Sequence, residues 1–178
     1  MELLTERLKL NPVTADDLEE VHRLHAAPEV AEFTTRPAPE TIEDTKLVIQ
    51  GWIDKQKAIV PEAYVFSIRL IDTDQFIGVI GLSIGMAKYR NADVGFTILP
   101  EHWGRGYTTE ALKRVIHFCF SELRLHRIEA GCATGNIGSV RVLEKAGMTR
   151  EGCKRNALPV RGQWLDSYFY AILESDGV

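Results

Sequence analysis

The sequence predicts a single α+β domain, residues 1–178, in which helices cover a mostly antiparallel sheet. Two observations lead to this prediction. Residues 63–99 have a strand-like period and contain three runs rich in β-forming residues, which is typical of consecutive strands. After Pro100 the apolar residues recur with the period of an amphipathic helix, and no internal repeat or flexible linker divides the chain.

The first third of the chain predicts one strand and two helices. Residues 7–13 alternate like a half-buried strand. Thr14 and Asp17 have the spacing of a capping box, which predicts that an amphipathic helix begins there. The pattern breaks at two prolines within residues 33–39, and a second helix is expected over residues 41–57.

The middle of the chain predicts three strands, over residues 64–71, 76–84 and 92–99. Residues 72–74 have the composition of a turn, and residues 85–91 form the second link. Because such short links join strands that lie side by side, an antiparallel meander is expected.

The C-terminal half predicts a helix, a strand, a short helix and a final strand. The first helix has its apolar residues at one helical face: Leu112, Val115, Ile116, Cys119, Phe120 and Leu123. A strand is expected over residues 126–133 and a short helix over residues 136–146. Gly147 suits the left-handed position that ends a helix. Residues 164–173 predict the last strand.

Composition limits the function classes. The net charge of −4 argues against a nucleic-acid-binding surface and suits a cationic substrate such as an amine. The three cysteines are odd in number and lack metal-ligand spacing, which indicates a reducing, cytoplasmic compartment and no metal site. The acidic start of the chain does not resemble a signal peptide, and no apolar run is long enough to predict a membrane span.

The turn at residues 100–110 carries the strongest chemical signal. A strand ends before it, Gly104 and Gly106 lie within it, and a strong helix begins directly after it. Such a turn presents backbone N–H groups at a helix N-terminus, where a diphosphate can bind. An ordinary strand-to-helix turn is the alternative interpretation. The Lys-Ser/Thr ending of a Walker loop and the full G-x-G-x-x-G of a dinucleotide fold are missing.

The order of several motifs resembles the GCN5-related N-acetyltransferase (GNAT) superfamily, and within it the RimJ/RimL-like branch. The resemblance runs from about residue 3 to residue 173 and rests on these segments: Leu4-Thr5-Glu6-Arg7-Leu8, Trp103-Gly104-Arg105-Gly106-Tyr107-Thr108, Asn136-Ile137-Gly138-Ser139, Leu143-Glu144-Lys145-Ala146-Gly147-Met148, Arg150-Glu151-Gly152 and residues 162–166. It implies a twisted, mostly antiparallel sheet of about seven strands with four main helices. It also implies direct acetyl transfer from acetyl-CoA to a primary amine, without an acyl-enzyme.

The resemblance also assigns the cofactor contacts. The family's pyrophosphate loop, R/Q-x-x-G-x-G/A, corresponds to residues 103–108, with Trp103 in place of Arg or Gln and Thr108 in place of the last Gly or Ala. Residues 98 and 99 resemble a bulged strand whose backbone holds the pantetheine and the thioester oxygen. The predicted cofactor-binding residues are Ile98, Leu99, Trp103, Gly104, Arg105, Gly106, Tyr107, Thr108, Thr109 and Asn136. Arg105, Arg141 and Lys145 are candidates for the 3′-phosphate, or else exposed helix residues.

Two residues are predicted to be catalytic. Where the superfamily commonly has an acidic tyrosine, this chain has Leu143, so the resemblance gives the role of general acid to Ser139, one helical turn earlier. The alternative is a first-turn serine that only caps the helix. Asp93 corresponds to a strand glutamate that deprotonates the amine, often through water. Its alternative is a solvated or ion-paired carboxylate, and His102 is expected on a surface loop.

The acceptor is the least specified part of the prediction. The resemblance favours a protein N-terminal α-amine of the ribosomal-protein type. Small amines such as polyamines or aminoglycosides, or a non-catalytic acyl-CoA-binding module, are the alternatives. The acceptor pocket is expected from residues 33–39 and from an irregular loop at residues 156–164, where Leu158 stands in place of a glutamate found in some family members. The resemblance to the family also implies a homodimer, which no feature of the sequence itself indicates.

Overall fold

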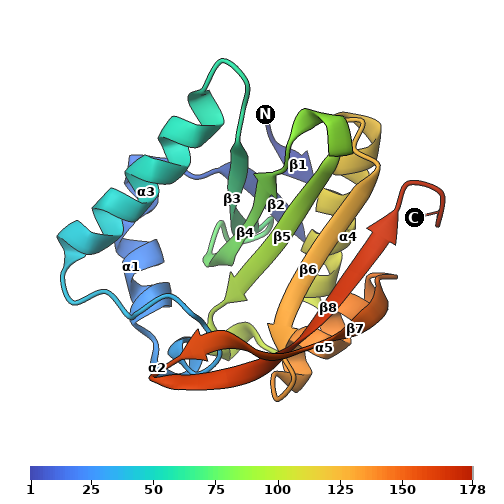
Figure 1. Ribbon diagram of the computed structural model, residues 1–178. Helices are drawn as coiled ribbons and strands as arrows, with labels where there is room; N and C mark the ends of the chain where they lie inside the picture. The colour runs from blue at the N-terminus through green and yellow to red at the C-terminus, as the bar shows by residue number, and fades with distance from the viewer. Residues whose placement is uncertain (178) are drawn as a thin grey trace.

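The computed structural model describes residues 1–177, which form an eight-stranded sheet with helices on both faces (Figure 1). The strands lie in the order β1-β2-β3-β4-β5-β6-β8-β7. The sheet is antiparallel except for one parallel pair, β5 and β6, at its centre. This is the α+β architecture that the sequence predicts.

The first five strands form a meander. They are β1 (Leu3–Leu4), β2 (Leu8–Pro12), β3 (Ala63–Leu70), β4 (Phe76–Ile84) and β5 (Asn91–Ile98). Short links join β1 to β2, β3 to β4 and β4 to β5, whereas β2 and β3 are connected by residues 13–62, which contain three α-helices. β3 pairs with β4 over almost its whole length. Alternation along these strands places apolar side chains on both faces of the sheet, because both faces are covered near its centre.

The remaining strands are β6 (Arg127–Ala133), β7 (Thr149–Val160) and β8 (Gln163–Leu173). β8 lies between β6 and β7 and is antiparallel to both. The β7–β8 hairpin extends beyond the sheet and passes across one end of the molecule toward the region of α2 (Figure 1).

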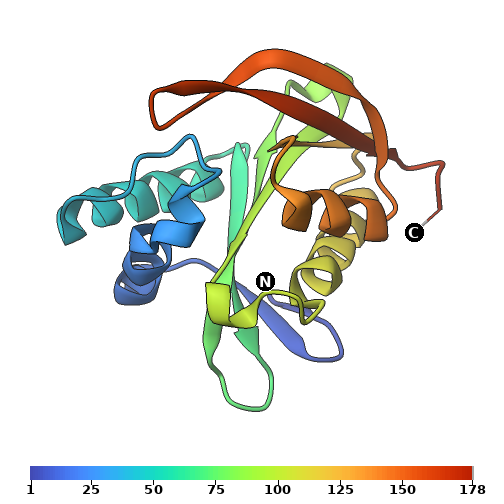
Figure 2. The same cartoon turned by 90° about the horizontal axis from the view of Figure 1, so that it is seen from below.

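Two helices cover each face. On one face lie α1 (Leu18–Ala26) and α3 (Ile42–Lys57), and on the other α4 (Tyr107–Ser121) and α5 (Ile137–Lys145) (Figure 2). A short helix, α2 (Pro28–Ala31), follows α1. None of the helices within residues 1–177 is both long and apolar enough to cross a bilayer.

Each face of the sheet buries its own hydrophobic core. The larger core lies under α4 and α5 and contains Leu112, Ile116 and Phe118 of α4. The smaller core lies under α1 and α3 and contains Val21, Leu24 and Ile49 with residues of β3 and β4.

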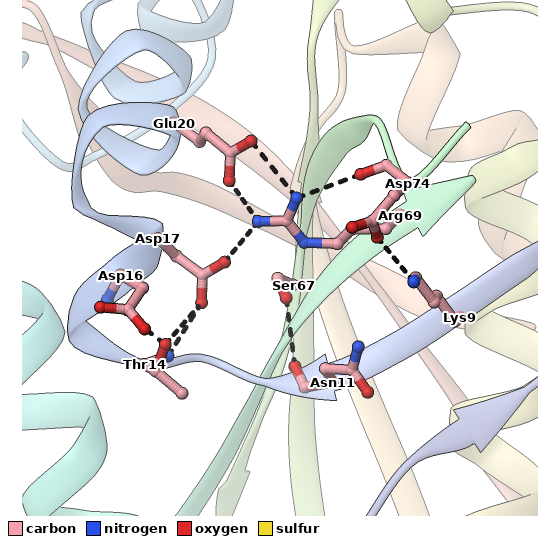
Figure 3. A network of polar contacts seen from close by, with 9 residues as sticks. All are labelled: Lys9, Asn11, Thr14, Asp16, Asp17, Glu20, Ser67, Arg69 and Asp74. Carbon is pink, nitrogen blue, oxygen red and sulfur yellow. Dashed lines mark hydrogen bonds and ion pairs between the residues drawn. The ribbon is translucent and has the colours of Figure 1, made fainter. Parts of the chain in front are cut away.

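An ion cluster joins α1 to the sheet (Figure 3). Arg69 of β3 donates from Nη2 to Asp17 Oδ1 at 2.7 Å and also pairs with Glu20. Its Nη1 donates to the carbonyl oxygen of Asp74 at 3.1 Å. The other Asp17 oxygen accepts from the amide of Thr14 at 2.9 Å, so the predicted capping box is confirmed and is also tied to the sheet.

Most predicted elements are confirmed to within about two residues, including the left-handed Gly147 with φ of 91°. The sequence prediction missed two strands, β1 and β7. Residues 156–164 were expected to be an irregular loop, and this is wrong, because residues 156–160 belong to β7 and residues 163–164 to β8. The run of β7 has no apolar alternation, so its period did not reveal it.

Arg69→Met should lower the free energy of unfolding by about 3 kcal/mol, because it leaves the buried Asp17 carboxylate without its cation. Urea denaturation measures the change. Lys46→Met is the matched control, since the Lys46–Glu43 pair is 62% and 70% exposed and should contribute less than about 0.5 kcal/mol. Equal stability of the two variants would contradict the assigned role of the cluster.

Candidate active site

The site opens where β5 and β6 separate. The two strands pair only at Asn91–Arg127, Ala92–Ile128 and Asp93–Glu129. Beyond this point β5 continues to Ile98 and β6 to Ala133, and both line a cavity of about 880 Å³. A cavity of this volume is in the range of cofactor and substrate sites.

Two helix N-termini face this cavity. β5 leads through the glycine turn into α4, and β6 leads through a short turn into α5, so both helices begin at the separated ends of the parallel strands. Gly104 and Thr108 line the cavity from the first turn, and Asn136 and Ser139 line it from the second. The free N–H groups and dipoles of both helices therefore favour an anionic guest here.

The glycine turn requires its two glycines. Gly104 and Gly106 have φ of 73° and 81°, in the left-handed region that favours glycine. A Cβ on Gly104 would meet no atom within 4 Å, so the space over this backbone is open to a ligand. Gly106 is the N-cap of α4 and offers no side chain to occupy the first N–H groups of the helix. This geometry fits a diphosphate on backbone amides.

Trp103 fixes the turn to the end of β5. Its indole Nε1 donates to the carbonyl oxygen of Ile98 at 2.7 Å, while the residue stays 52% exposed and lines the cavity. The residue that replaces the family's usual Arg or Gln therefore has a structural contact in this chain.

The bulge expected at residues 98 and 99 is not present in the β4–β5 ladder of the described chain. Pairing runs in continuous register from Ile84–Ala92 to Gly78–Ile98. The Leu99 amide donates to the Ile77 oxygen at 2.9 Å, so it is used inside the sheet, and Leu99 does not line the cavity. Successive residues of a strand direct their N–H and C=O groups to opposite edges. Because the Leu99 amide points toward β4, the Ile98 amide points the other way, toward the gap beside β6.

The start of α5 places Ser139 in the cavity. Asn136 is the N-cap, and its Oδ1 accepts from the Ser139 amide at 3.0 Å. The cap is thus made by the asparagine side chain and does not need the Ser139 hydroxyl. Leu143 is buried behind it. Among the cavity-lining residues of the described chain none is a tyrosine, so Ser139 is the hydroxyl that α5 offers.

Asp93 lies at the point where β5 and β6 separate. It lines the cavity, is exposed to it, and has Ser83 as its register partner on β4 and Glu129 on β6. Partial desolvation in the concave wall, with the Glu129 carboxylate, raises the pKa of Asp93 above its usual value, and Lys154 opposes the rise. A raised pKa makes this carboxylate a better proton acceptor than an ordinary aspartate.

His102 does not lie on the surface as expected. A 3₁₀ turn at Pro100–His102 brings its ring inward to 6.2 Å from the Tyr107 ring. It is 6% exposed, and burial lowers its pKa. His102 does not line the cavity and is therefore no candidate for the base.

The cysteines occupy three environments. Cys119 is in the core under α4 and Cys153 is exposed. Cys132 of β6 lines the cavity, and burial together with Glu144 raises its pKa to about 11. It is a neutral thiol at physiological pH and hence a poor nucleophile. Within residues 1–177 no group of three or more His, Cys, Asp or Glu side chains could hold a metal ion.

The outer end of the cavity is lined by segments that are far apart in the sequence. Residues 33–37 line it, as expected, and Trp52 of α3 joins them with the Arg36 guanidinium 5.3 Å from its ring. His25 packs edge-on against Trp52 at 5.8 Å. Burial, followed by the Arg36 and His22 charges, lowers the pKa of His25 to about 4, so it adds no charge at neutral pH.

Leu158 lines the opposite side through a bulge in β7. The register between β7 and β8 shifts between Lys154 and Leu158. Asn156 has φ of 48° there, and its amide donates to Asp166 Oδ1 at 2.8 Å. The Asp166 carbonyl oxygen accepts from the Thr134 amide at 3.0 Å, which ties the hairpin to the turn before α5.

The structure brings most of the predicted site together. The predicted residues that line the cavity are Asp93, Ile98, Trp103, Gly104, Thr108, Asn136 and Ser139. The predicted residues outside the lining are Leu99, Arg105, Gly106, Tyr107 and Thr109. Sequence reasoning missed His25, Trp52 and Gly131, because no local motif marks them and only the fold brings them to the cavity.

Comparison with known proteins identifies the family. Residues 7–149 match the profile described as "Acetyltransferase (GNAT) domain". A probable N-acetyltransferase of Bacillus subtilis, YjcK, is 41% identical over 65% of the chain and 64% of its own length. The uncharacterized N-acetyltransferase YoaA of the same organism is 33% identical over 97% of the chain and 96% of its own length. The ribosomal-protein-serine acetyltransferase of Escherichia coli is 26% identical over 72% of the chain and 70% of its length.

Solved structures agree in fold. A GNAT-family acetyltransferase of Bacillus anthracis has a TM-score of 0.85 at 30% identity, covering 98% of the chain and 99% of its own. Mycobacterium smegmatis RimJ in complex with CoA-disulfide has a TM-score of 0.87 at 24% identity, over 96% and 83%. Spermidine N-acetyltransferase of Vibrio cholerae with CoA and spermine has a TM-score of 0.85 at 22% identity, over 97% and 98%.

Gly104→Ala should weaken CoA binding about ten-fold, because its Cβ would project into the space where the diphosphate approaches the backbone. Gly162→Ala is a matched control, since Gly162 has φ of 79° and equally open surroundings but lies in the β7–β8 turn. Both variants should lose about 1 kcal/mol of stability from backbone strain. Calorimetric titration with CoA measures binding, and equal affinities of the two variants would exclude the turn as the phosphate site.

Proposed function

The chain belongs to the GNAT superfamily of acetyl-CoA-dependent N-acetyltransferases, and from this premise we propose that its acceptor is the N-terminal α-amine of a protein, of the ribosomal-protein type. One observation carries the proposal. The cavity continues from the glycine turn past Ser139 and Asp93 to an outer end whose walls combine apolar side chains with charges of both signs in near balance.

The outer end suits a peptide better than a polyamine. Its acidic residues Glu29 and Glu32 are accompanied by Arg36 and Lys55. A polyamine carries a positive charge at each end and along its length, so its site needs a clear excess of carboxylates. A peptide instead presents one amine and then side chains of varied chemistry, for which apolar walls and charges of both signs are suitable partners.

The proton chemistry also favours an α-amine. A model α-amine has a pKa near ~8, whereas a lysine amine has a pKa near ~10.4. At neutral pH a weaker base therefore suffices for an α-amine. Asp93, with its raised pKa and a water between carboxylate and amine, fits this demand.

The mechanism that we infer is direct transfer. Acetyl-CoA supplies the acetyl thioester; the amine nitrogen forms a bond to its carbonyl carbon as the carbon–sulfur bond breaks. Asp93 receives the amine proton through water, and the Ile98 amide, which faces the gap, donates to the carbonyl oxygen. Ser139 Oγ gives its proton to the departing sulfur and takes up another from solvent, while Asp93 releases the amine proton to solvent, so both residues return to their starting states. The neutral thiol of Cys132 supports a route without an acyl-enzyme.

A small-amine acceptor and a non-catalytic acyl-CoA-binding module are the alternatives. The Vibrio cholerae relative with spermine is a small-amine enzyme and the Escherichia coli relative a ribosomal-protein enzyme, so relatives of both acceptor classes exist. The observation that favours a non-catalytic role is the replacement of the family tyrosine by Leu143. The position of Ser139 at the cavity argues against a non-catalytic role, because its hydroxyl offers a proton one helical turn before Leu143.

An acceptor panel tests the proposal. Release of CoA thiol is measured with peptides that have a free N-terminus, the same peptides blocked at the N-terminus but containing lysine, spermidine, and an aminoglycoside. The free N-terminus should give the highest kcat/KM, by about a hundred-fold or more over the other acceptors. Preference for spermidine would support the small-amine alternative. Tight CoA binding without release for any acceptor would support the non-catalytic one.

Ser139→Ala should lower kcat about a hundred-fold with little change in the KM for acetyl-CoA, because it removes the proton donor and leaves the helix cap on Asn136. Steady-state kinetics with the preferred acceptor measures both constants. Ser121→Ala is the control, since that hydroxyl donates to the His117 carbonyl oxygen in the last turn of α4. Undiminished kcat in Ser139→Ala would refute the general-acid role alone.

A further inference from the structure

The N-terminal segment is bound to the first turn of α4 by a single carboxylate. Glu110 Oε1 accepts from the Thr5 hydroxyl at 2.6 Å and from the Arg7 amide at 2.9 Å. Its Oε2 accepts from Arg7 Nε at 2.7 Å and from Arg7 Nη2 at 2.6 Å. Glu110 thus anchors the turn between β1 and β2 to the helix that begins at the glycine turn.

The same guanidinium lies against the glycine turn. Arg7 Nη1 donates to the Arg105 carbonyl oxygen at 3.2 Å, and the guanidinium carbon lies 4.6 Å from the centre of the Tyr107 ring. A Cβ built on Gly106 would lie 3.5 Å from Arg7 Nη2. Arg7 therefore contacts both the anchoring carboxylate and the turn that faces the cavity.

The position of Glu110 is unfavourable for an anion site. Its amide donates to the Gly106 carbonyl oxygen at 3.1 Å, so its carboxylate belongs to the first turn of α4. The side chain is 19% exposed, which limits screening by water. Burial alone would raise the pKa of Glu110, but the hydrogen bonds from Thr5 and Arg7 lower it below its usual value. The group is thus ionised at neutral pH and, unpaired, would repel a diphosphate.

We propose that Arg7 is a positioning residue for acetyl-CoA: its guanidinium neutralises the Glu110 carboxylate, so that the turn at residues 104–109 keeps the positive potential that the diphosphate needs. Glu110 holds the β1–β2 turn against α4, and Arg7 offsets the negative charge of that anchor. The proposal concerns the donor half of the site and is independent of which amine is acetylated.

The test separates the effect of charge on CoA binding from the effect of geometry, and it uses the full chain. CoA binding is measured by calorimetric titration at low salt for Arg7→Gln, Arg7→Lys, Glu110→Gln and the Arg7→Gln/Glu110→Gln double variant. Arg7→Gln should raise the Kd about ten-fold, because an uncompensated carboxylate then lies in the first turn of α4, next to the glycine turn that would bind the diphosphate. The double variant and Arg7→Lys should both bind within about three-fold of the wild type, since neither leaves a net negative charge.

If Arg7 acts only by holding the turn in place, the CoA affinities of the variants should follow a different order. If the double variant binds CoA as weakly as Arg7→Gln, or if Arg7→Lys is as weak as Arg7→Gln, lost geometry explains the effect and the proposal is overturned. The difference between wild type and Arg7→Gln should also shrink in high salt, which screens charge but does not restore a displaced turn. A salt-independent difference would overturn the proposal.

One further variant, and one already in the panel, keep the test informative. Lys9→Gln removes a cation from β2, two residues after Arg7, whose partner is Asp74 and not the glycine turn, and it should leave the Kd unchanged. If Arg7→Gln fails to fold, Glu110→Gln alone decides, because it keeps Arg7 and removes the negative charge. CoA should then bind as tightly as in the wild type or more tightly, and weaker binding would overturn the proposal.

Discussion

The short pairing between β5 and β6 is the constraint on which the site depends. Parallel hydrogen bonding joins the strands at three register pairs that end at Asp93–Glu129, and the strands then diverge. If pairing continued, the backbone groups of β5 beyond Asp93 would be used inside the sheet and no cavity would form. Divergence instead leaves the Ile98 amide facing the gap. It also directs the ends of both strands into α4 and α5, whose N-termini reach the same cavity. One change in strand pairing therefore creates the space, the donors and the electrostatic potential.

The parts of the fold that could be predicted are those with a clear hydrophobic pattern or composition. The strand over residues 7–13 and the helix that carries Leu112 and Ile116 were predicted because burial on one face imposes a period on the sequence. The strand over residues 76–84 is buried on both faces and was predicted from its run of β-forming residues. β7 could not be predicted in this way. It is held in the sheet by backbone bonds to β8, and most of its side chains are exposed on both faces, so no period of two appears. The bulge that places Leu158 in the cavity depends on Asp166, ten residues after Asn156, and no local pattern encodes that bond.

The residues of the site can likewise be divided into those that could be predicted from the sequence and those that could not. The glycine turn, Asn136 and Ser139 could be found because each is a local motif, in which backbone conformation and helix capping require particular residues close together in the sequence. His102 was placed wrongly, since a loop histidine is usually exposed, whereas the 3₁₀ turn folds this ring inward against Tyr107. Arg7 was found only as part of a family motif. Its contact with Glu110 joins residues 103 positions apart in the sequence, so no local pattern could show it.

This division explains why donor chemistry and acceptor choice can vary separately. In the proposed arrangement, the donor half relies on backbone N–H groups at two helix N-termini, so its sequence requirement is a few glycines, a cap and a hydroxyl. The proposed acceptor half relies on side chains such as Trp52, Arg36 and Leu158, which come from three separate segments and have no backbone role in the donor half. Substitution there changes the walls met by the amine without moving the glycine turn. Acceptor specificity can therefore diverge on a constant donor site, which is consistent with similar folds among relatives named for ribosomal proteins and for spermidine.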